Sequence, residues 1–204
     1  MSNLVKEPLI TELQYLPPVS WFEQIAVHEI IYLDNRENFQ KGTYRNRCHI
    51  LGPNGLLRLS IPLQHGKHQH KVMGEVLIAK EHAWQKNHWM TICSCYRRSA
   101  YFEYFEDSFY PFYHNPYEKL FDFNYDLLKL VFKILKIEKE IKFPDTYVEP
   151  GTPGFIDKRS VIRPNKNADK IPAQKKYIQV FSDRFEFIPD LSIIDFIFNN
   201  GNQF

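Results

Sequence analysis

The sequence predicts an α/β fold in which a mixed sheet with a β-hairpin is flanked by helices and a long proline-rich loop lies near the C-terminus. Short apolar runs of strand length alternate with stretches in which apolar residues recur at helical spacing. The Asn-Gly pair that begins at Asn54 separates two apolar arms, as in a tight hairpin. Because 204 residues is a usual size for one domain, we expect a single domain over residues 1–204.

The first third of the chain is expected to contain a strand, a helix and a second strand. Residues 8–13 form the first strand, and Pro18 suits the opening of a helix over residues 19–29. Residues 30–33 are a short apolar run that ends at Asp34, which is typical of a strand covered on both faces. Polar residues after this strand are therefore expected at the edge of a sheet.

The middle of the chain is expected to contain the hairpin, a further strand and a long helix. Residues 47–51 and 56–63 form the two arms, since apolar and polar residues alternate in the second arm. Residues 75–79 are predicted to be a strand and residues 81–98 a helix, with apolar positions at helical spacing. Strand and helix thus continue to alternate.

The last part of the chain predicts two helices, a strand and a capped terminal helix. Residues 115–121 form a short helix, and Asn124 caps the next one, which carries an apolar stripe. Residues 177–181 are expected to be a strand. Ser192 begins a capping-box pattern ahead of an apolar helix that ends near Gly201.

Residues 143–176 contain five prolines, two glycines and an excess of basic residues. A loop of this length without secondary structure is typical of a functional flap or of disorder. We therefore expect a long loop or flap over these residues.

The composition excludes several classes of protein. The chain has 26 Lys and Arg against 24 Asp and Glu, a balance that does not fit a general binder of nucleic acids or membrane surfaces. It contains no apolar run long enough to span a membrane, and its start lacks the pattern of a signal peptide, which predicts a cytoplasmic protein. Its three cysteines fit neither a disulfide framework nor a zinc ribbon, so we expect reduced thiols.

A basic block before the hairpin is the most informative clue to a site. Lys41, Arg45 and Arg47 can hold phosphate or carboxylate, because a guanidinium gives two parallel hydrogen bonds. Alternation along a strand would place Arg45 and Arg47 on one face, with Tyr44 and Asn46 on the other. The alternative is an exposed strand edge that is protected by charge.

Candidates for proton transfer lie close to the predicted strand ends. Glu12 and Glu37 are candidates for a general acid or base, because active sites of α/β proteins gather at such ends. His88 lies one helical turn from Trp84 and is a candidate for lining a pocket. Cys48 is the single thiol in an electropositive setting, and the alternative for it is a buried, inert cysteine.

Several other site types do not fit the motifs in the chain. The cluster HGKHQH at residues 65–70 contains interspersed lysines and no carboxylate, so solvated histidines are expected there rather than a metal site. No motif for phosphate cradling or for a Ser or Cys nucleophile is present, which argues against nucleoside triphosphatases and dinucleotide enzymes. No cofactor is predicted from the residues.

Several blocks along the chain resemble the WbqC-like protein family, in the form typical of Bacteroidetes. The resemblance is carried by LQYLPPVSWF at residues 13–22, ENFQKGTYRNRC at 37–48, LLRLSIPL at 56–63, HAWQKNHWMTI at 82–92, SAYFEYFEDSF at 99–109 and FIPDLSIIDFIFNNG at 187–201. This family is associated with gene clusters for O-antigen and other surface polysaccharides. The resemblance therefore implies modification of a sugar or nucleotide-sugar, by acyl or aminoacyl transfer. It supports Lys41, Asn46 and Arg47 as site residues and includes Trp84, Gln85 and His88, whereas Thr11 replaces a His that many relatives carry.

Two hypotheses follow from these residues. In the first, the protein is a transferase of surface-glycan synthesis that binds a small anionic or sugar-nucleotide ligand. Its anionic donor is bound by Lys41, Arg45 and Arg47, Asn46 and Gln14 orient the acceptor, and Glu12 or His88 moves a proton; Tyr44 and Trp84 complete the binding residues. In the second, the protein binds or assembles without catalysis, through the aromatic residues 101–117 and the flap 150–172. The oligomeric state is open in both.

Overall fold

The structure is a computed structural model that describes residues 7–64, 71–80, 83–164 and 174–204. Four short strands form a parallel sheet in the order β5-β2-β1-β6. Their bounds are Leu9–Thr11 for β1, Ile30–Leu33 for β2, Glu140–Lys142 for β5 and Ile156–Asp157 for β6. All three residues of β1 are buried, so both faces of the sheet are covered at this strand, as expected for parallel strands.

The hairpin forms a separate antiparallel pair. Strand β3, Arg47–Gly52, pairs with β4, Gly55–Ser60, from Arg47 opposite Ser60 to Gly52 opposite Gly55. Gly55 has a φ of 112°, a conformation that glycine adopts without the steric cost of a side chain. The predicted hairpin is confirmed, and it does not extend the parallel sheet.

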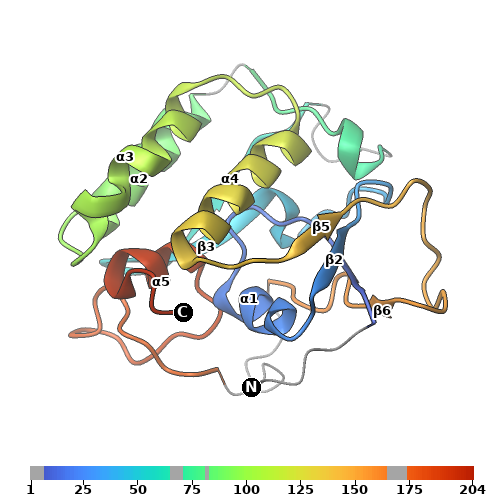
Figure 1. The fold of residues 1–204 in the computed structure, drawn as a ribbon. Helices are drawn as coiled ribbons and strands as arrows, with labels where there is room; N and C mark the ends of the chain where they lie inside the picture. Colours follow the sequence, from blue (N-terminus) through green and yellow to red (C-terminus); the bar gives the residue numbers. More distant parts are fainter. Residues whose placement is uncertain (1–6, 65–70, 81–82, 165–173) are drawn as a thin grey trace.

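The part of the chain that the structure describes contains five α-helices, which are arranged in layers around the sheet. They are α1 (Val19–Ala26), α2 (Trp84–Tyr96), α3 (Phe102–His114), α4 (Leu120–Leu135) and α5 (Ile193–Asn200). Helix α1 makes the crossover from β1 to β2, and α4 lies between the sheet and the α2–α3 pair (Figure 1). Two 3-10 helices, η1 (Tyr44–Asn46) and η3 (Met73–Glu75), lie in the connections.

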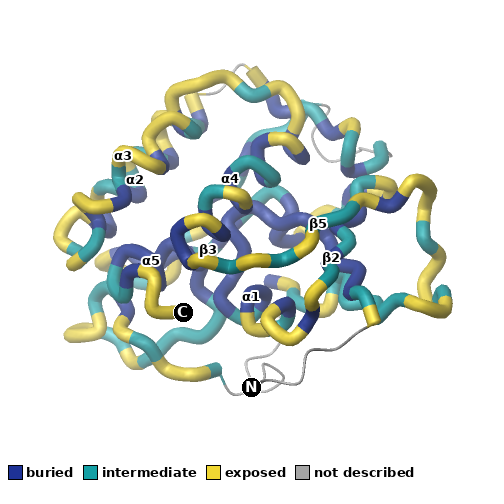
Figure 2. The backbone as a smooth tube through the Cα atoms, viewed as in Figure 1, coloured by how far each residue is buried: buried dark blue, intermediate teal, exposed yellow. Residues whose placement is uncertain are grey.

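One apolar core links these layers. Trp21 and Phe22 of α1 are fully buried against it, as are Phe123 of α4 and Phe198 of α5. The tube coloured by burial shows dark blue segments gathered at the centre and yellow segments on the outer faces of α2 and α3 (Figure 2). The high aromatic content of the chain is therefore used mainly for packing.

The predicted α/β class, with a hairpin and flanking helices, is confirmed. The strand at residues 30–33 and the Ser192 cap of α5 are also present, since the Ser192 side chain accepts a hydrogen bond from the Ile194 amide. Helix α4 begins at Leu120 and residues 115–119 are not helical, so the predictions of a separate short helix over residues 115–121 and of a cap at Asn124 are wrong. Asn124 lies inside α4, where its side chain donates to the carbonyl of Arg45.

Other predicted elements are wrong or lie outside the described residues. Residues 75–79 do not form a strand, because Glu75 ends η3 and Leu77 and Ile78 make isolated bridges. Residues 177–181 are irregular and turn. The sequence did not predict α3, β5 or β6. Within the predicted loop at 143–176, residues 156–157 form β6, and residues 165–173 lie outside the described residues, as does the histidine cluster at 65–70.

Across the ranges that the structure describes, no helix combines the length and apolar character needed to cross a membrane.

Candidate functional site

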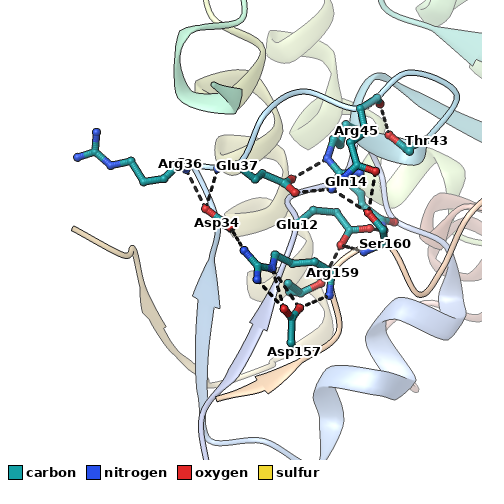
Figure 3. Close-up of polar contacts among 12 residues, drawn as sticks. Glu12, Gln14, Asp34, Arg36, Glu37, Thr43, Arg45, Asp157, Arg159 and Ser160 are labelled. Carbon is teal, nitrogen blue, oxygen red and sulfur yellow. Dashed lines mark hydrogen bonds and ion pairs between the residues drawn. The ribbon is translucent and has the colours of Figure 1, made fainter. Parts of the chain in front are cut away.

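The carboxyl ends of the parallel strands bring a cluster of charged residues together. From β1 the sheet grows outward through β2 and β5 on one side, and β6 alone lies on the other side. The strand order therefore reverses between β1 and β6, and ligands of open α/β sheets bind at such a point, beyond the carboxyl ends of the strands. Glu12 follows β1, Asp34 follows β2, and Arg159 and Ser160 follow β6 (Figure 3).

Glu12 is buried and held by hydrogen bonds on both carboxylate oxygens. Its Oε1 accepts from Gln14 Nε2 at 2.8 Å, and its Oε2 accepts from the Ser160 backbone amide at 2.7 Å. Ser160 has a φ of 59°, an uncommon conformation for a residue with a side chain. This conformation accompanies the placement of its amide on Glu12, and its hydroxyl lies within 3.2 Å of both Arg45 Nη2 and Gln40 Oε1.

Glu37 and Arg45 form a buried bidentate ion pair. Arg45 Nε and Nη2 each donate to a Glu37 oxygen at 2.6 Å, and the Arg45 side chain is fully buried. Burial raises the pKa of the Glu37 carboxyl to about 7 against the opposing effect of Arg45, and the neighbouring Glu12 and Asp34 raise it further. A carboxyl with such a pKa can both take and give a proton near neutral pH.

A second guanidinium joins the end of β2 to the end of β6. Arg159 Nη1 donates to Asp34 Oδ2 at 2.6 Å, and its remaining donors reach both oxygens of Asp157. Arg159 also donates to the carbonyl of Val148 at 2.8 Å, which fixes the preceding segment against the sheet. Burial alone would raise the pKa of the Asp157 carboxyl, but the hydrogen bonds from Arg159 hold this pKa below its ordinary value.

An open cavity of about 590 Å³ lies over these groups. We call it the polar cavity; it is lined by Glu37, Asn38, Phe39, Gln40, Tyr147, Pro150, Gly151, Asp157, Arg159, Ser160 and Arg163. Arg163 at its rim is exposed and donates to Gln40 Oε1 at 2.9 Å. The cavity thus offers carboxylates, guanidinium groups, an amide and a hydroxyl beside the half-exposed ring of Tyr147.

A smaller cavity of about 320 Å³ contains the basic residues that the sequence singled out. We call it the basic pocket; it is lined by Phe39, Lys41, Asn46, Arg47, Ile61, Pro62 and Leu63. Arg47 Nε is buried and has no hydrogen-bond partner among the described residues, and the same is true of Asn46 Oδ1. Burial and the nearby Arg58 both lower the pKa of Arg47. Among the described residues Arg47 forms no ion pair, whereas Arg45 is paired with Glu37.

The structure separates basic residues that we expected from the sequence to lie together. Because Tyr44–Asn46 is a 3-10 helix rather than part of a strand, the expectation that Arg45 and Arg47 share a strand face is wrong. Arg45 points to Glu37, while Arg47 lines the basic pocket with Lys41. Tyr44 lines neither cavity, and its ring lies edge-on to His49.

His88 and Trp84 lie in the aromatic core. His88 Nδ1 is 3.0 Å from the hydroxyl of Tyr15, which is also 3.0 Å from the hydroxyl of Tyr113. Trp84 packs edge-on against His88 and Phe123. Burial lowers the pKa of His88 to about 4, so its imidazole is neutral at pH 7. Its surroundings are those of a packed core histidine.

The cysteines are free, and Cys48 is buried. Burial raises the pKa of the Cys48 thiol, against a smaller opposing effect of Ser192, so the neighbouring Arg47 does not make it a reactive thiolate. In the segments that the structure describes, no group of three or more His, Cys, Asp or Glu side chains is placed to hold a metal ion.

Sequence reasoning missed the residues at the end of β6 and directly after it. Asp157, Arg159 and Ser160 lie more than a hundred positions from Asp34 and Glu12, and β6 has two residues, too few for a strand pattern. The prolines and glycines around them indicated a loop. The one available signal was the basic content of that loop, which does not identify Arg159 among its neighbours.

Comparisons with known proteins identify the family of the chain. Residues 14–154 match the WbqC-like protein family, so the chain belongs to it. A relative in Mycobacterium tuberculosis, described as uncharacterized protein Rv1507c, is 31% identical over 110 residues, which are 53% of this chain and 47% of the relative. The chain therefore matches about half the length of that relative. No solved structure matches the chain.

Proposed function

We propose that this WbqC-like protein is a transferase that modifies a sugar or nucleotide-sugar of surface-polysaccharide synthesis. The observation that carries the proposal is that the basic pocket and the polar cavity share one lining residue, Phe39. One cavity suits an anionic group and the other suits a polyhydroxylated one. A donor and an acceptor bound in them would meet near Phe39 and Gln40.

The basic pocket supports the binding of an anionic donor. Arg47 is half-buried next to Arg58, and its Nε has no hydrogen-bond partner among the described residues. Lys41 adds a second cation to the lining of the pocket. A phosphate or carboxylate would relieve the repulsion between the guanidinium groups and accept charge-assisted hydrogen bonds. Asn46 would orient the ligand through its Oδ1, which has no partner in the part of the chain that the structure describes.

The polar cavity supports proton transfer to or from an acceptor. Glu37 and Asp157 both line it, and their environments shift their pKa values in opposite directions. Such a separation suits one carboxyl to exchange a proton while the other stays charged. We therefore assign the general base to Glu37, with Glu12 behind it raising its pKa and Arg45 holding its position.

Family membership supports the substrate class. The association of the WbqC-like family with surface-polysaccharide gene clusters favours a sugar or nucleotide-sugar acceptor and an acyl or aminoacyl donor. The assignment to the Bacteroidetes-type branch of the family stays a prediction.

The experiment pairs ligand binding with product analysis. Nucleotide-sugars, free nucleotides and acyl thioesters are screened by thermal shift, because a ligand that binds the folded state raises stability by RT ln(1 + [L]/Kd). Donor and acceptor that bind are then incubated together, and the sugar product is measured by mass spectrometry. The variant is Arg47→Ala and the control is Arg36→Ala. The Arg36 side chain points away from the charged residues at the strand ends (Figure 3).

A new sugar product, with donor affinity at least about tenfold weaker in Arg47→Ala than in Arg36→Ala, would support the proposal. The rate should rise with pH through about 7, as expected for Glu37 acting as a base. Binding of both substrates without any product would reject catalysis. Equal donor affinity in the two variants would remove the basic pocket from the site.

A second candidate function is assembly with another copy of this chain through the aromatic helix α3. Tyr104 is 78% exposed and Tyr110 is 48% exposed on this helix, although most aromatic side chains of the segment are buried. If this function holds, the mass in solution should exceed that of the monomer, and Tyr104→Ser should reduce it. A monomer at all accessible concentrations would leave the assembly role without support.

A further inference from the structure

A third cavity of about 1130 Å³ lies between the C-terminal half of α2 and residues 178–184, and it shares no lining residue with the polar cavity or the basic pocket. We call it the arginine groove, after Arg97, Arg98 and Arg184 on its walls. Since it lies apart from the proposed transferase site, a ligand bound there would be distinct from the proposed donor and acceptor.

The charge of the arginine groove is unbalanced. Its walls carry three guanidinium groups and one carboxylate, Asp183, which is largely exposed and lies 3.6 Å from Arg184. Within the residues that the structure describes, neither Arg97 nor Arg98 forms an ion pair. The dipole of α2 favours cations at its C-terminus, which accounts for Arg97 and Arg98. It does not account for Arg184, which a different segment brings to the same groove.

The groove also exposes apolar side chains on both walls. Met90 of α2 is 59% exposed and Ile178 on the facing segment is 66% exposed, and Trp89 lines the groove beside Met90. Exposed side chains of this size beside several cations suit a ligand that has both an apolar part and an anionic part.

The wall that carries Ile178 is fixed by side-chain contacts to its backbone. Asn200 donates to the Ile178 carbonyl at 2.8 Å and accepts from the Ile178 amide at 3.3 Å. Gln179 makes the same pair of bonds with the backbone of Ile188, at 2.7 and 2.9 Å. Because the segment is held in place, the exposure of Ile178 belongs to a formed surface, and little ordering is needed for a ligand to bind.

We propose that the arginine groove binds a phosphate monoester that carries an apolar chain. The guanidinium groups of Arg97, Arg98 and Arg184 bind the phosphate, since a planar guanidinium can donate two parallel hydrogen bonds to a pair of phosphate oxygens. Met90 and Ile178 cover the apolar chain and remove its surface from water. The same chemistry is offered by a soluble alkyl phosphate and by a phosphate headgroup in a membrane.

The experiment measures binding of octyl phosphate, below its micelle concentration, to the full-length protein by calorimetry. Inorganic phosphate and octanol test the two halves of the ligand, and vesicles that contain phosphatidic acid test a membrane source. The variants are Arg97→Ala combined with Arg98→Ala, and Ile178→Ser. The matched control is Arg36→Ala, an exposed arginine outside the groove.

Octyl phosphate is expected to bind at least about tenfold more tightly than inorganic phosphate or octanol. The double arginine variant should lose at least about tenfold in affinity, and Arg36→Ala should lose none. Ile178→Ser should weaken octyl phosphate several-fold and leave inorganic phosphate unchanged. Equal affinity for octyl phosphate and inorganic phosphate, or an unaffected double variant, would each overturn the proposal. Vesicle binding that the double variant loses would support a membrane headgroup as the source of the phosphate. None of these outcomes depends on transferase activity.

Discussion

Asp195 provides a test of how burial controls charge in the core. It is fully buried in the first turn of α5, and the Tyr96 hydroxyl donates to its Oδ2 at 3.1 Å. Burial raises the pKa of Asp195 from 3.8 to about 7, although hydrogen bonds from Tyr96 and the Val180 backbone oppose the shift. The positive end of the helix dipole also favours the charged form, by less than burial disfavours it.

The sign of the effect on stability follows from proton binding. In the unfolded chain Asp195 releases its proton near pH 3.8, whereas the folded protein keeps it until about pH 7. Between these values the folded state binds more protons, so the free energy of unfolding falls as pH rises through this window. A shift of about three pH units corresponds to about 4 kcal/mol at 1.36 kcal/mol per unit.

The variant Asp195→Asn resembles the protonated acid at every pH. We expect it to match the wild type near pH 4 and to be more stable than the wild type by up to about 4 kcal/mol at pH 8. Urea unfolding at pH 4, 6 and 8 measures this difference. Other titrating groups, including Glu37, are present in both proteins, so their contributions cancel in the difference.

Asp183→Asn is the matched control, because the Asp183 side chain is 75% exposed. Its difference from the wild type should stay within about 0.5 kcal/mol at all three pH values. If the difference between wild type and Asp195→Asn does not change with pH, Asp195 titrates in the folded protein as it does in the unfolded chain, and the reasoning from burial is refuted.

Three further substitutions test the packing of the site and of α5. Arg45→Met should destabilise the protein by about 3–5 kcal/mol because it leaves the buried Glu37 carboxylate unpaired, and adding Glu37→Leu should recover most of that loss in chemical denaturation. Ser192→Ala should cost about 1 kcal/mol through loss of the α5 cap, with full stability in the variant contradicting the capping role. Gly201→Ala should lower the midpoint of thermal unfolding, since Gly201 has a φ of 69° and an added Cβ would lie 3.0 Å from the Tyr101 ring; an unchanged midpoint would show that the ring yields freely.

The sequence predicted the elements whose signals are local. Examples are the apolar run at Ile30–Leu33, the Asn-Gly turn of the hairpin and the Ser192 cap of α5, and each of these signals is contained in a few consecutive residues. Local signals are sufficient there because turn geometry and capping depend on neighbouring residues. The same holds for α1, which follows Pro18.

Helix α3 was missed although its pattern was present. Phe102, Phe105, Phe109 and Tyr113 are buried at helical spacing, but Pro111 lies inside the helix and the exposed face is also aromatic. Pro111 has no amide to donate to the carbonyl four residues earlier, and the helix ends three residues after it. Composition therefore concealed a helix that packing against α2 and α4 stabilises.

The site was predictable only in part, because half of it comes from distant parts of the chain. Glu12 and Glu37 were identified from the ends of predicted strands, and the structure brings both to one cluster. The partners Arg159 and Ser160 follow a two-residue strand, β6, that pairs with β1. No local pattern encodes such a pairing.

The pairing of each cation separates structural arginines from candidate binding ones. Arg45 and Arg159 are buried and bound to carboxylates, so a further anion would have to compete with Glu37 or with Asp34 for them. Arg47 lies beside another arginine and keeps a free buried donor among the described residues, so an incoming anion would find an unsatisfied site. The charge of Arg45 therefore positions Glu37, while the charge of Arg47 in the basic pocket is available to a ligand. Replacing Arg45 should thus affect stability first, whereas replacing Arg47 should affect ligand binding first, and comparing both variants in one unfolding and one binding assay distinguishes the two roles.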